Sequence, residues 1–199
     1  MQRVLLATTN KGKQKEFKAM LSRLGFDLIT PLDLNQEAPK VVEDGLTFEE
    51  NALLKAKAYA EAFQLPTIAD DSGLEVDALG GKPGVFSARF AGPNATDAEN
   101  VAKLLDQLKR VPHHKRTARF VCVIAYIEED KAPLLVKGTC SGFIAEEPKG
   151  TSGFGYDPVF YLPQFHKTMA ELTLEEKNKI SHRAQALEQF VRKWQEKNR

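Results

Sequence analysis

TIADDSGLEV, residues 67–76, is the most informative stretch of the chain, because two adjacent acids directly follow an apolar run. Residues 67–69 predict a short buried strand. Asp70 and Asp71 then stand side by side at the predicted strand end, with no Lys or Arg close by in the sequence. Like charges repel each other and resist burial. Because α/β folds place ligand sites beyond the carboxyl ends of strands, the pair predicts such a site.

Outward from this stretch, strand and helix patterns alternate through the first half of the chain. Buried strands are predicted over residues 4–8 and 26–30. A helix over residues 11–24 is predicted from apolar residues at helical spacing, which are Phe17, Met20, Leu21 and Leu24. The T-x-x-E capping pattern opens further helices at Thr47 and Thr96, which run to about residues 63 and 109. A structured Gly-rich loop is predicted between them, over residues 73–92.

The second half of the chain adds a hairpin to this alternation. Two long strands are predicted over residues 118–127 and 134–146, joined by a charged turn. A Gly-rich loop, a short strand, a third capping box and a closing helix follow, at residues 148–155, 159–162, 173–176 and 183–194. Early alternation followed by a hairpin predicts an α/β fold with a mixed sheet.

Composition bounds the class of protein. The 199 residues suit one domain, residues 1–199, and the net charge of +1 gives no overall electrostatic reason to bind nucleic acid. The apolar run at residues 4–7 is too short for a signal peptide or a membrane span, so a cytoplasmic protein without a membrane partner is expected. Cys122 and Cys140 lie in strand-like segments and are interpreted as reduced core thiols, because nothing demands a disulfide.

A candidate anion site follows the first predicted strand and opens the first predicted helix. Its residues are Thr8, Thr9, Asn10, Lys11, Gly12 and Lys13. Free backbone N–H groups and the helix dipole favour an anion at such a start, where Asn10 would cap and Lys13 would pair with phosphate. The spacing of a Walker loop is absent. An ordinary helix cap with solvated lysines explains the same pattern.

A candidate metal site comes from a set of acidic residues, which are Glu43, Asp44, Glu49, Glu50, Asp70 and Asp71. Magnesium prefers a few carboxylates together with water and substrate phosphates, and it would offset the repulsion between the two adjacent aspartates. Two simpler interpretations stay open: Glu50 is explained by its capping box, and Asp70 or Asp71 would cap the turn at Ser72.

Two further motifs carry candidate chemistry. Phe154-Gly155-Tyr156-Asp157-Pro158 offers aromatic rings to stack on a base and an acid to bond its edge, although aromatic residues beside Gly and Pro also anchor loops. The segment 177–183 is interpreted as a solvated basic helix entrance, and its Ser181-His182 pair raises the alternative of a hydrolase triad. Such a triad is not expected, because no G-x-S-x-G elbow is present and neighbours in sequence are poorly placed to act as nucleophile and base. Cys-His chemistry is not expected, since neither Cys lies on a loop or helix start.

Six motifs in order resemble one known family. They are Thr8-x-Asn10-x-x-Lys13, Thr47-Phe48-x-Glu50-Asn51-Ala52-x-x-Lys55-Ala56, Ala69-Asp70-Asp71-Ser72-Gly73-Leu74, Gly81-x-Pro83-Gly84-x-x-Ser87-Ala88-Arg89, Phe154-Gly155-Tyr156-Asp157-Pro158 and Ser181-His182-Arg183. This pattern is similar to the inosine triphosphate pyrophosphatase family, in its bacterial form, from residue 4 to about residue 187. Tyr156 stands where some relatives carry Trp, and Thr9 stands where Gly is frequent.

The resemblance implies a fold and a reaction. The fold is a long twisted mixed β-sheet flanked by helices, with two lobes around a central substrate cleft. The reaction is hydrolysis of dITP, ITP and XTP, in which water attacks the α-phosphate to give a monophosphate and pyrophosphate. It further implies a magnesium cofactor and a homodimer. Two alternatives are a pyrophosphatase for other nucleotides, such as dTTP or UTP, and a nucleotide-binding protein without turnover.

The resemblance also implies site residues. Asp71 would be the catalytic carboxylate, and the metal would be held by Glu43, Asp71 and Asp70, with Glu50 as the alternative to Glu43. The phosphates would be bound by Thr8, Thr9, Asn10, Lys11, Gly12, Lys13 and Lys55. The base and the rest of the substrate would be bound by Ser72, Phe154, Gly155, Tyr156, Asp157, Lys177, Ser181, His182 and Arg183.

Overall fold

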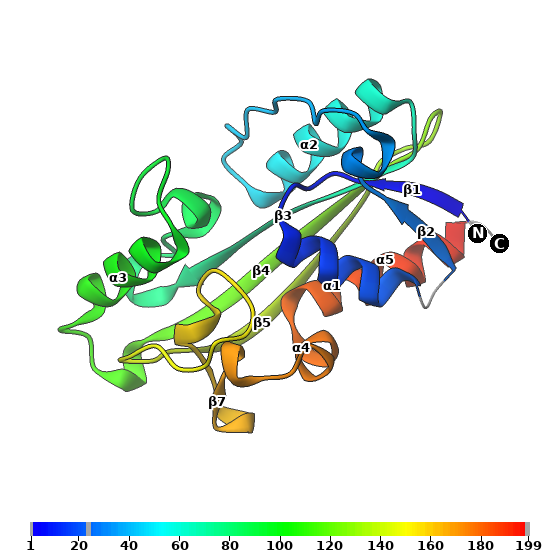
Figure 1. The fold of residues 1–199 in the computed structure, drawn as a ribbon. Coiled ribbons are helices and arrows are strands. Elements are labelled where there is room, and N and C mark those ends of the chain that lie inside the picture. Colours follow the sequence, from blue (N-terminus) through cyan, green and yellow to red (C-terminus); the bar gives the residue numbers. More distant parts are fainter. Residues whose placement is uncertain (1, 23–24, 198–199) are drawn as a thin grey trace. The chain divides into compact units, whose positions relative to one another are not determined.

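The computed structural model describes residues 2–22 and 25–197 and contains a seven-stranded mixed sheet, shown in Figure 1. The strands are β1 (Gln2–Leu6), β2 (Phe26–Ile29), β3 (Thr67–Val76), β4 (Thr117–Ile127), β5 (Leu134–Ile144), β6 (Phe160–Leu162) and β7 (Lys167–Thr168). Their order across the sheet is β2-β1-β3-β4-β5-β6-β7. β1 pairs in parallel with β2 and β3, whereas β6 pairs antiparallel with β5 and β7. The predicted α/β class with a mixed sheet is confirmed.

Helices connect and flank these strands. They are α1 (Lys11–Leu21), α2 (Phe48–Phe63), α3 (Asp97–Leu108), α4 (Leu174–Ile180) and α5 (His182–Lys197). All three predicted capping boxes form, with Thr47, Thr96 and Thr173 as the N-cap residues. α1 ends at Leu21, and the end predicted for it at residue 24 lies outside the described residues.

The chain divides into two compact units. Of the described residues, unit 1 holds 2–22, 25–71, 122–138 and 183–197, and unit 2 holds 72–121 and 139–182. Each unit has its own hydrophobic core. The unit 2 core gathers residues of α3 with strand residues such as Leu74, Phe120 and Phe160.

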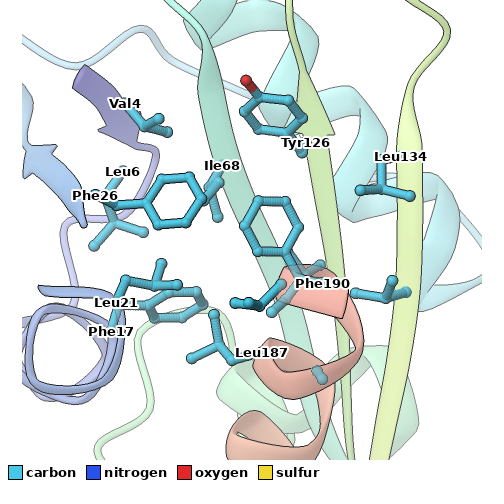
Figure 2. Packing of buried hydrophobic residues seen from close by; sticks show 14 of the residues in the cluster. Val4, Leu6, Phe17, Leu21, Phe26, Ile68, Tyr126, Leu134, Leu187 and Phe190 are labelled. Atoms are coloured by element: carbon cyan, nitrogen blue, oxygen red, sulfur yellow. The ribbon is translucent and has the colours of Figure 1, made fainter. Parts of the chain in front are cut away.

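The unit 1 core lies where α1 and α5 pack on the sheet. Figure 2 shows Phe17 and Leu21 of α1 beside Leu187 and Phe190 of α5, together with side chains from β1, β2, β3, β4 and β5. Phe26 packs against Phe190, with ring centroids 5.8 Å apart. This packing fixes the position of α1, whose first turns carry the predicted phosphate-binding residues.

β3 differs from the prediction and matters most for the site. It runs through Val76 rather than ending at residue 69, so Asp70 and Asp71 lie in the middle of a strand. The predicted strand end was wrong, because burial of Leu74 and Val76 continues the strand beyond the two acids. The first part of the loop predicted over residues 73–92 therefore belongs to β3.

Smaller differences concern element ends. β1 stops at Leu6, so the segment 7–10 forms the whole connection to α1. The short strand β7 was not predicted, α4 was indicated only by the capping box at Thr173, and residues 145–146 lie outside β5. Cys122 and Cys140 are buried thiols, as predicted. In the part of the chain that the structure describes, no helix is both long enough and apolar enough to cross a membrane.

Candidate active site

The side chains of Asp70 and Asp71 point to opposite faces of β3, because successive residues of a strand alternate. Figure 1 shows α1 and α5 on one side of β3 and α2 on the other. Asp70 faces α1 and α5, where its Oδ2 lies 2.8 Å from Lys13 Nζ and 3.8 Å from the Arg183 guanidinium. The chain itself therefore supplies the positive charge that balances this acid.

Asp70 belongs to a buried row of alternating charges. Arg183, which is 1% exposed, also pairs with Glu16 of α1. Burial by itself would raise the pKa of Asp70, but attraction by Lys13, Arg183 and Lys55 outweighs burial and holds that pKa well below its usual range. The row Glu16, Arg183, Asp70 and Lys13 ties α1, β3 and α5 together at the predicted phosphate-binding residues.

Asp71 meets a different environment on the α2 side of the strand. Its Oδ2 accepts a hydrogen bond of 3.2 Å from Asn51 Nδ2, and the residue is only 8% exposed. Burial raises the pKa of Asp71 to about 6, against the opposing attraction of Lys55 and Lys13 and with a further raising effect from Glu43. A buried carboxylate with a shifted pKa is typical of catalytic acids and bases.

Glu43 joins Asp71 through Lys55, which lies one turn after Asn51 on α2. Lys55 Nζ is 3.1 Å from Glu43 Oε2 and donates a 2.9 Å hydrogen bond to the backbone oxygen of Asp70. Burial tends to lower the pKa of Lys55, but Asp70, Glu43 and Asp71 together raise it above its usual value, so it stays charged. Glu43 and Asp71 thus share one cation and repel each other.

Glu50, the alternative to Glu43, is engaged in capping α2. Its Oε2 accepts hydrogen bonds from Leu46 N at 2.7 Å and Thr47 N at 3.1 Å. A carboxylate that closes a capping box gives up those contacts if it turns toward a metal. The geometry therefore favours Glu43 over Glu50 beside Asp71.

The connection from β1 to α1 is built as the sequence predicts. Asn10 is the N-cap residue, and its Oδ1 accepts a 3.0 Å hydrogen bond from Lys13 N. Thr8 is buried, and its Oγ1 accepts from Asn10 N at 3.2 Å. Thr9 and Lys11 are exposed, and Gly12 is half-buried. The segment therefore leads into the N-terminal end of α1, where the helix dipole and the backbone N–H groups favour an anion.

A second cluster lies in unit 2, around the loop between β5 and β6. Asp157 Oδ2 accepts a 2.9 Å hydrogen bond from Phe154 N and lies 2.6 Å from Lys177 Nζ. The Lys177 ammonium also stands 4.8 Å from the centre of the Phe154 ring. A half-buried ring beside a fixed ammonium and carboxylate offers stacking and hydrogen bonding to a flat polar ligand.

Of the other predicted base-binding residues of unit 2, Gly155 and Tyr156 fasten this loop to neighbouring segments. Tyr156 is buried and donates a 2.8 Å hydrogen bond from its hydroxyl to Ser87 O, while Gly155 N donates to Asp97 Oδ2 at 2.7 Å. His182 is buried and stacks on Phe120, with ring centroids 4.8 Å apart. The remaining two positions are Ser181, buried at the end of α4, and Ser72, half-buried on β3.

Comparison with known proteins identifies the family of this chain. The family model described as Ham1 family matches residues 4–193. The chain belongs to the Ham1 family. Its curated relatives include the dITP/XTP pyrophosphatase of Geobacillus kaustophilus, 53% identical over 98% of this chain and 96% of the relative. The dITP/XTP pyrophosphatase of Escherichia coli K12 is also 53% identical, over 94% of this chain and 95% of the relative.

A solved Ham1 structure has the same fold. The HAM1 protein from Coxiella burnetii superposes with a TM-score of 0.87 at 46% sequence identity, covering 98% of this chain and all of that chain. The family resemblance inferred from the six sequence motifs is thereby confirmed.

The predicted site residues divide between the two units. Unit 1 holds Thr8 to Lys13, Lys55, Glu43, Asp70, Asp71 and Arg183. Unit 2 holds Ser72, the loop residues Phe154 to Asp157, Lys177, Ser181 and His182. Arg183 was predicted to bind the base, but its contacts to Glu16 and Asp70 lie in unit 1. A role of Arg183 in base recognition stays a prediction.

Sequence reasoning missed several supporting residues. Glu16 carries a signal, because it lies one turn after Lys13 on the stripe that includes Phe17 and Met20, so an acid there is predicted to be buried. Asn51 carries a similar signal, because it lies among the buried, mostly apolar residues of α2. The contacts of Asp97 and Phe120 with the loop and with His182 have no local sequence signal.

The side chains that could hold a metal ion at this site are carboxylates. Among the residues that the structure describes, no three His, Cys, Asp or Glu side chains group closely enough to hold a metal ion by themselves. Glu43 and Asp71 offer oxygen ligands only and repel each other across Lys55. Two carboxylates fit magnesium, which usually takes its remaining ligands from water and substrate phosphates.

Proposed function

We propose that this protein hydrolyses non-canonical purine nucleoside triphosphates, namely dITP, ITP and XTP, to the monophosphate and pyrophosphate. The observation that carries the proposal is the likeness, over nearly the whole chain, to relatives named dITP/XTP pyrophosphatase. The charge of the two clusters supports it, because unit 1 offers cations and carboxylates and unit 2 offers an aromatic ring with hydrogen-bonding groups. We further propose that residues 1–199 act as one catalytic domain.

The phosphates are assigned to unit 1. Lys13 and Lys55 attract the triphosphate, and the opening N–H groups of α1 beside Asn10 bind its oxygens. Glu43 and Asp71 would hold magnesium, and when bound this ion supplies charge neutralisation at the phosphates and a more acidic water. Asp70 is already paired with Lys13, so its part is to hold that lysine in place.

Asp71 is assigned to the attacking water. The water oxygen forms a bond to the α-phosphorus, the bond from that phosphorus to the bridging oxygen breaks, and pyrophosphate leaves. Asp71 accepts the water proton or fixes the position of the water. In the metal-free protein burial raises the pKa of Asp71, and a raised pKa favours a carboxylate as a general base.

The base is assigned to unit 2. The Phe154 ring would stack on the purine, and donors from Lys177 and His182 would meet the 6-keto oxygen of hypoxanthine or xanthine. Adenine presents an amino donor at that position, and an unpaired buried polar group costs about 1–3 kcal/mol, roughly tenfold or more in discrimination. Guanine shares the keto group and must be rejected at its 2-amino group.

A nucleotide panel tests the proposal. Pyrophosphate release is measured from ITP, XTP, GTP, ATP, dTTP and UTP, each with magnesium and with a chelator. We expect kcat/KM for ITP and XTP to exceed that for ATP at least about tenfold, and all release to depend on magnesium. Equal values for ITP and ATP would contradict the assignment to non-canonical purines, and tight ITP binding without release would indicate a binding protein.

Oligomeric state and compartment are further parts of the proposal. A homodimer in the cytoplasm is expected from the family resemblance, with no nucleic-acid partner. Analytical ultracentrifugation of the full chain tests the dimer, and cell fractionation tests the compartment.

A further inference from the structure

Helices α2 and α3 open with the same polar pattern. The N-cap and first turn of α2 read Thr47-Phe48-Glu49-Glu50-Asn51, and those of α3 read Thr96-Asp97-Ala98-Glu99-Asn100. In each, the Thr is the N-cap residue, the Glu closes the capping box, and the next residue is Asn. Asn51 is 1% exposed and Asn100 is 3% exposed. Two buried asparagines thus occupy the same position in two helices.

Both asparagines tie a preceding stretch of backbone to the helix. Asn51 Oδ1 accepts from Gly45 N at 2.8 Å, and its Nδ2 lies 3.4 Å from Gly45 O. Asn100 Oδ1 accepts from Ala91 N at 2.8 Å, and its Nδ2 donates to Ala88 O at 3.2 Å. Holding the preceding loop is therefore the role that the two residues share.

Asn51 makes one contact of a different kind. Its Nδ2 donates to Asp71 Oδ2 at 3.2 Å, within the buried part of the site. One amide group therefore binds both the catalytic strand β3 and the loop that carries Glu43. The corresponding amide of Asn100 bonds backbone atoms at both of its ends.

The loop that carries Glu43 depends on this link. Residues 35–46 contain no helix or strand, and the segment that ends at Leu46 is tied to α2 through Glu50, Asn51 and Lys55. A Cβ atom at Gly45 would lie 2.7 Å from Asn51 Oδ1, so the loop backbone packs directly against the amide. Asn51 is therefore one of three side chains that hold this loop against α2.

We propose that Asn51 is a positioning residue, which sets Glu43 and Asp71 at the separation that a divalent cation requires. This inference rests on the proposed function, which assigns those two carboxylates to magnesium. Asn51 acts through its two hydrogen-bonded partners and does not itself contact the ion. Loss of a group that orients metal ligands typically lowers metal affinity about 10–100-fold.

The experiment measures Mn²⁺ binding to the metal-free full chain by electron paramagnetic resonance, with Mn²⁺ standing in for Mg²⁺. Asn51→Ala is compared with Asn100→Ala, the matched variant that removes the same buried side chain from the same helix position. Both are expected to lower the melting temperature. Only Asn51→Ala is expected to raise the Mn²⁺ dissociation constant, by about 10–100-fold.

A second variant tests the same inference if Asn51→Ala does not fold. Gly45→Ala places a methyl group 2.7 Å from Asn51 Oδ1 and 2.8 Å from Glu50 Cβ, so it should displace the loop from α2 and also weaken Mn²⁺ binding, while Asn51 and Asp71 themselves are unchanged. An Mn²⁺ affinity within twofold of wild type in Asn51→Ala, or in Gly45→Ala if only that variant folds, would overturn the inference.

One further variant separates this inference from the proposed function. Glu43→Gln removes an assigned ligand and should abolish strong Mn²⁺ binding. If Glu43→Gln binds Mn²⁺ as wild type does, the metal assignment itself is wrong. If Glu43→Gln loses binding while Asn51→Ala keeps it, the metal assignment stands and the positioning role of Asn51 is refuted.

Discussion

Asp70 and Asp71 are adjacent in sequence, yet each charge meets a different environment. Asp70 lies 2.8 Å from Lys13, and its pKa is held low by cations in spite of burial. Asp71 lies against the Asn51 amide, and burial raises its pKa to about 6. The two charges are expected to affect stability with opposite signs. The charge of Asp70 is stabilised by its cationic partners, whereas burial destabilises the charge of Asp71.

Asp71→Asn should stabilise the metal-free protein while it abolishes activity. The pKa of Asp71 is raised from 3.8 to about 6, so its favourable contribution is complete below pH 3.8 and is lost as the pH rises through 6. Removing the charge should raise the free energy of unfolding at pH 7.5 by up to about 3 kcal/mol. The gain should vanish below pH 4, as urea unfolding with a chelator at both pH values can measure. At the same time kcat should fall at least about 100-fold.

Asp70→Asn is the control for that substitution. The pKa of Asp70 is lowered, so its contribution is present at neutral pH and is lost only as the pH falls through the folded-state pKa. This variant should therefore be less stable than wild type at pH 7.5. Equal changes in stability for the two variants would contradict the assigned environments.

At the scale of elements, α1 joins the phosphate-binding loop to the core through one buried ion pair. Glu16 pairs with Arg183 of α5, which in turn lies 3.8 Å from Asp70 of β3. Three elements therefore meet through side chains that are almost completely buried. Breaking a buried pair by removing one partner is costly, since it leaves the other charge uncompensated.

Glu16→Gln should lower the free energy of unfolding by about 3–5 kcal/mol. Chemical denaturation at pH 7.5 measures this change. The matched control is Asp27→Asn, which removes the partner of Arg3 from an exposed ion pair in the same unit. Exposed pairs contribute about 0–1 kcal/mol, so equal losses in the two variants would contradict the buried role of Glu16.

The loop between β5 and β6 allows a test of the base cluster. Gly153 has φ +79°, and a Cβ atom there would collide with the Asp157 carboxylate that holds Phe154 N and Lys177. Gly153→Ala should raise KM for ITP about tenfold, since displacing Asp157 disrupts one or more polar contacts. Gly80→Ala is the control, because Gly80 has φ +63° with open space around it. It should cost about 1 kcal/mol of stability without changing KM, and an unchanged KM in both variants would argue against the cluster.

At the scale of the whole molecule, each unit holds one cluster with its own proposed ligand, which is phosphate in unit 1 and the base in unit 2. Hydrogen exchange can test this assignment on the full chain. Pyrophosphate with magnesium should slow exchange in residues 8–13 and 43–55, and inosine should slow it in residues 153–157 and 177–182, because ligand contacts protect the amides that they cover. Protection of residues 8–13 by inosine alone would contradict the assignment.

Much of the fold was predictable because its signals are local. The three capping boxes depend on residues three positions apart, so Thr47, Thr96 and Thr173 marked helix starts that the structure confirms. Strand ends were less predictable, because they depend on pairing partners far away in sequence. β3 thus continues through two acids that the sequence treats as a strand end.

The sequence by itself determined the family, the mixed α/β sheet and the residue types available for a triphosphate, because motif spacing and periodicity are properties of the chain. The tertiary structure alone decided the partners of each charge. Lys13 and Arg183, far apart in sequence, both reach Asp70, while Asn51 and Lys55 serve the other face of β3. The physical reason is that burial and electrostatic attraction act through space. The charge state of an acid therefore depends on neighbours that folding brings to it.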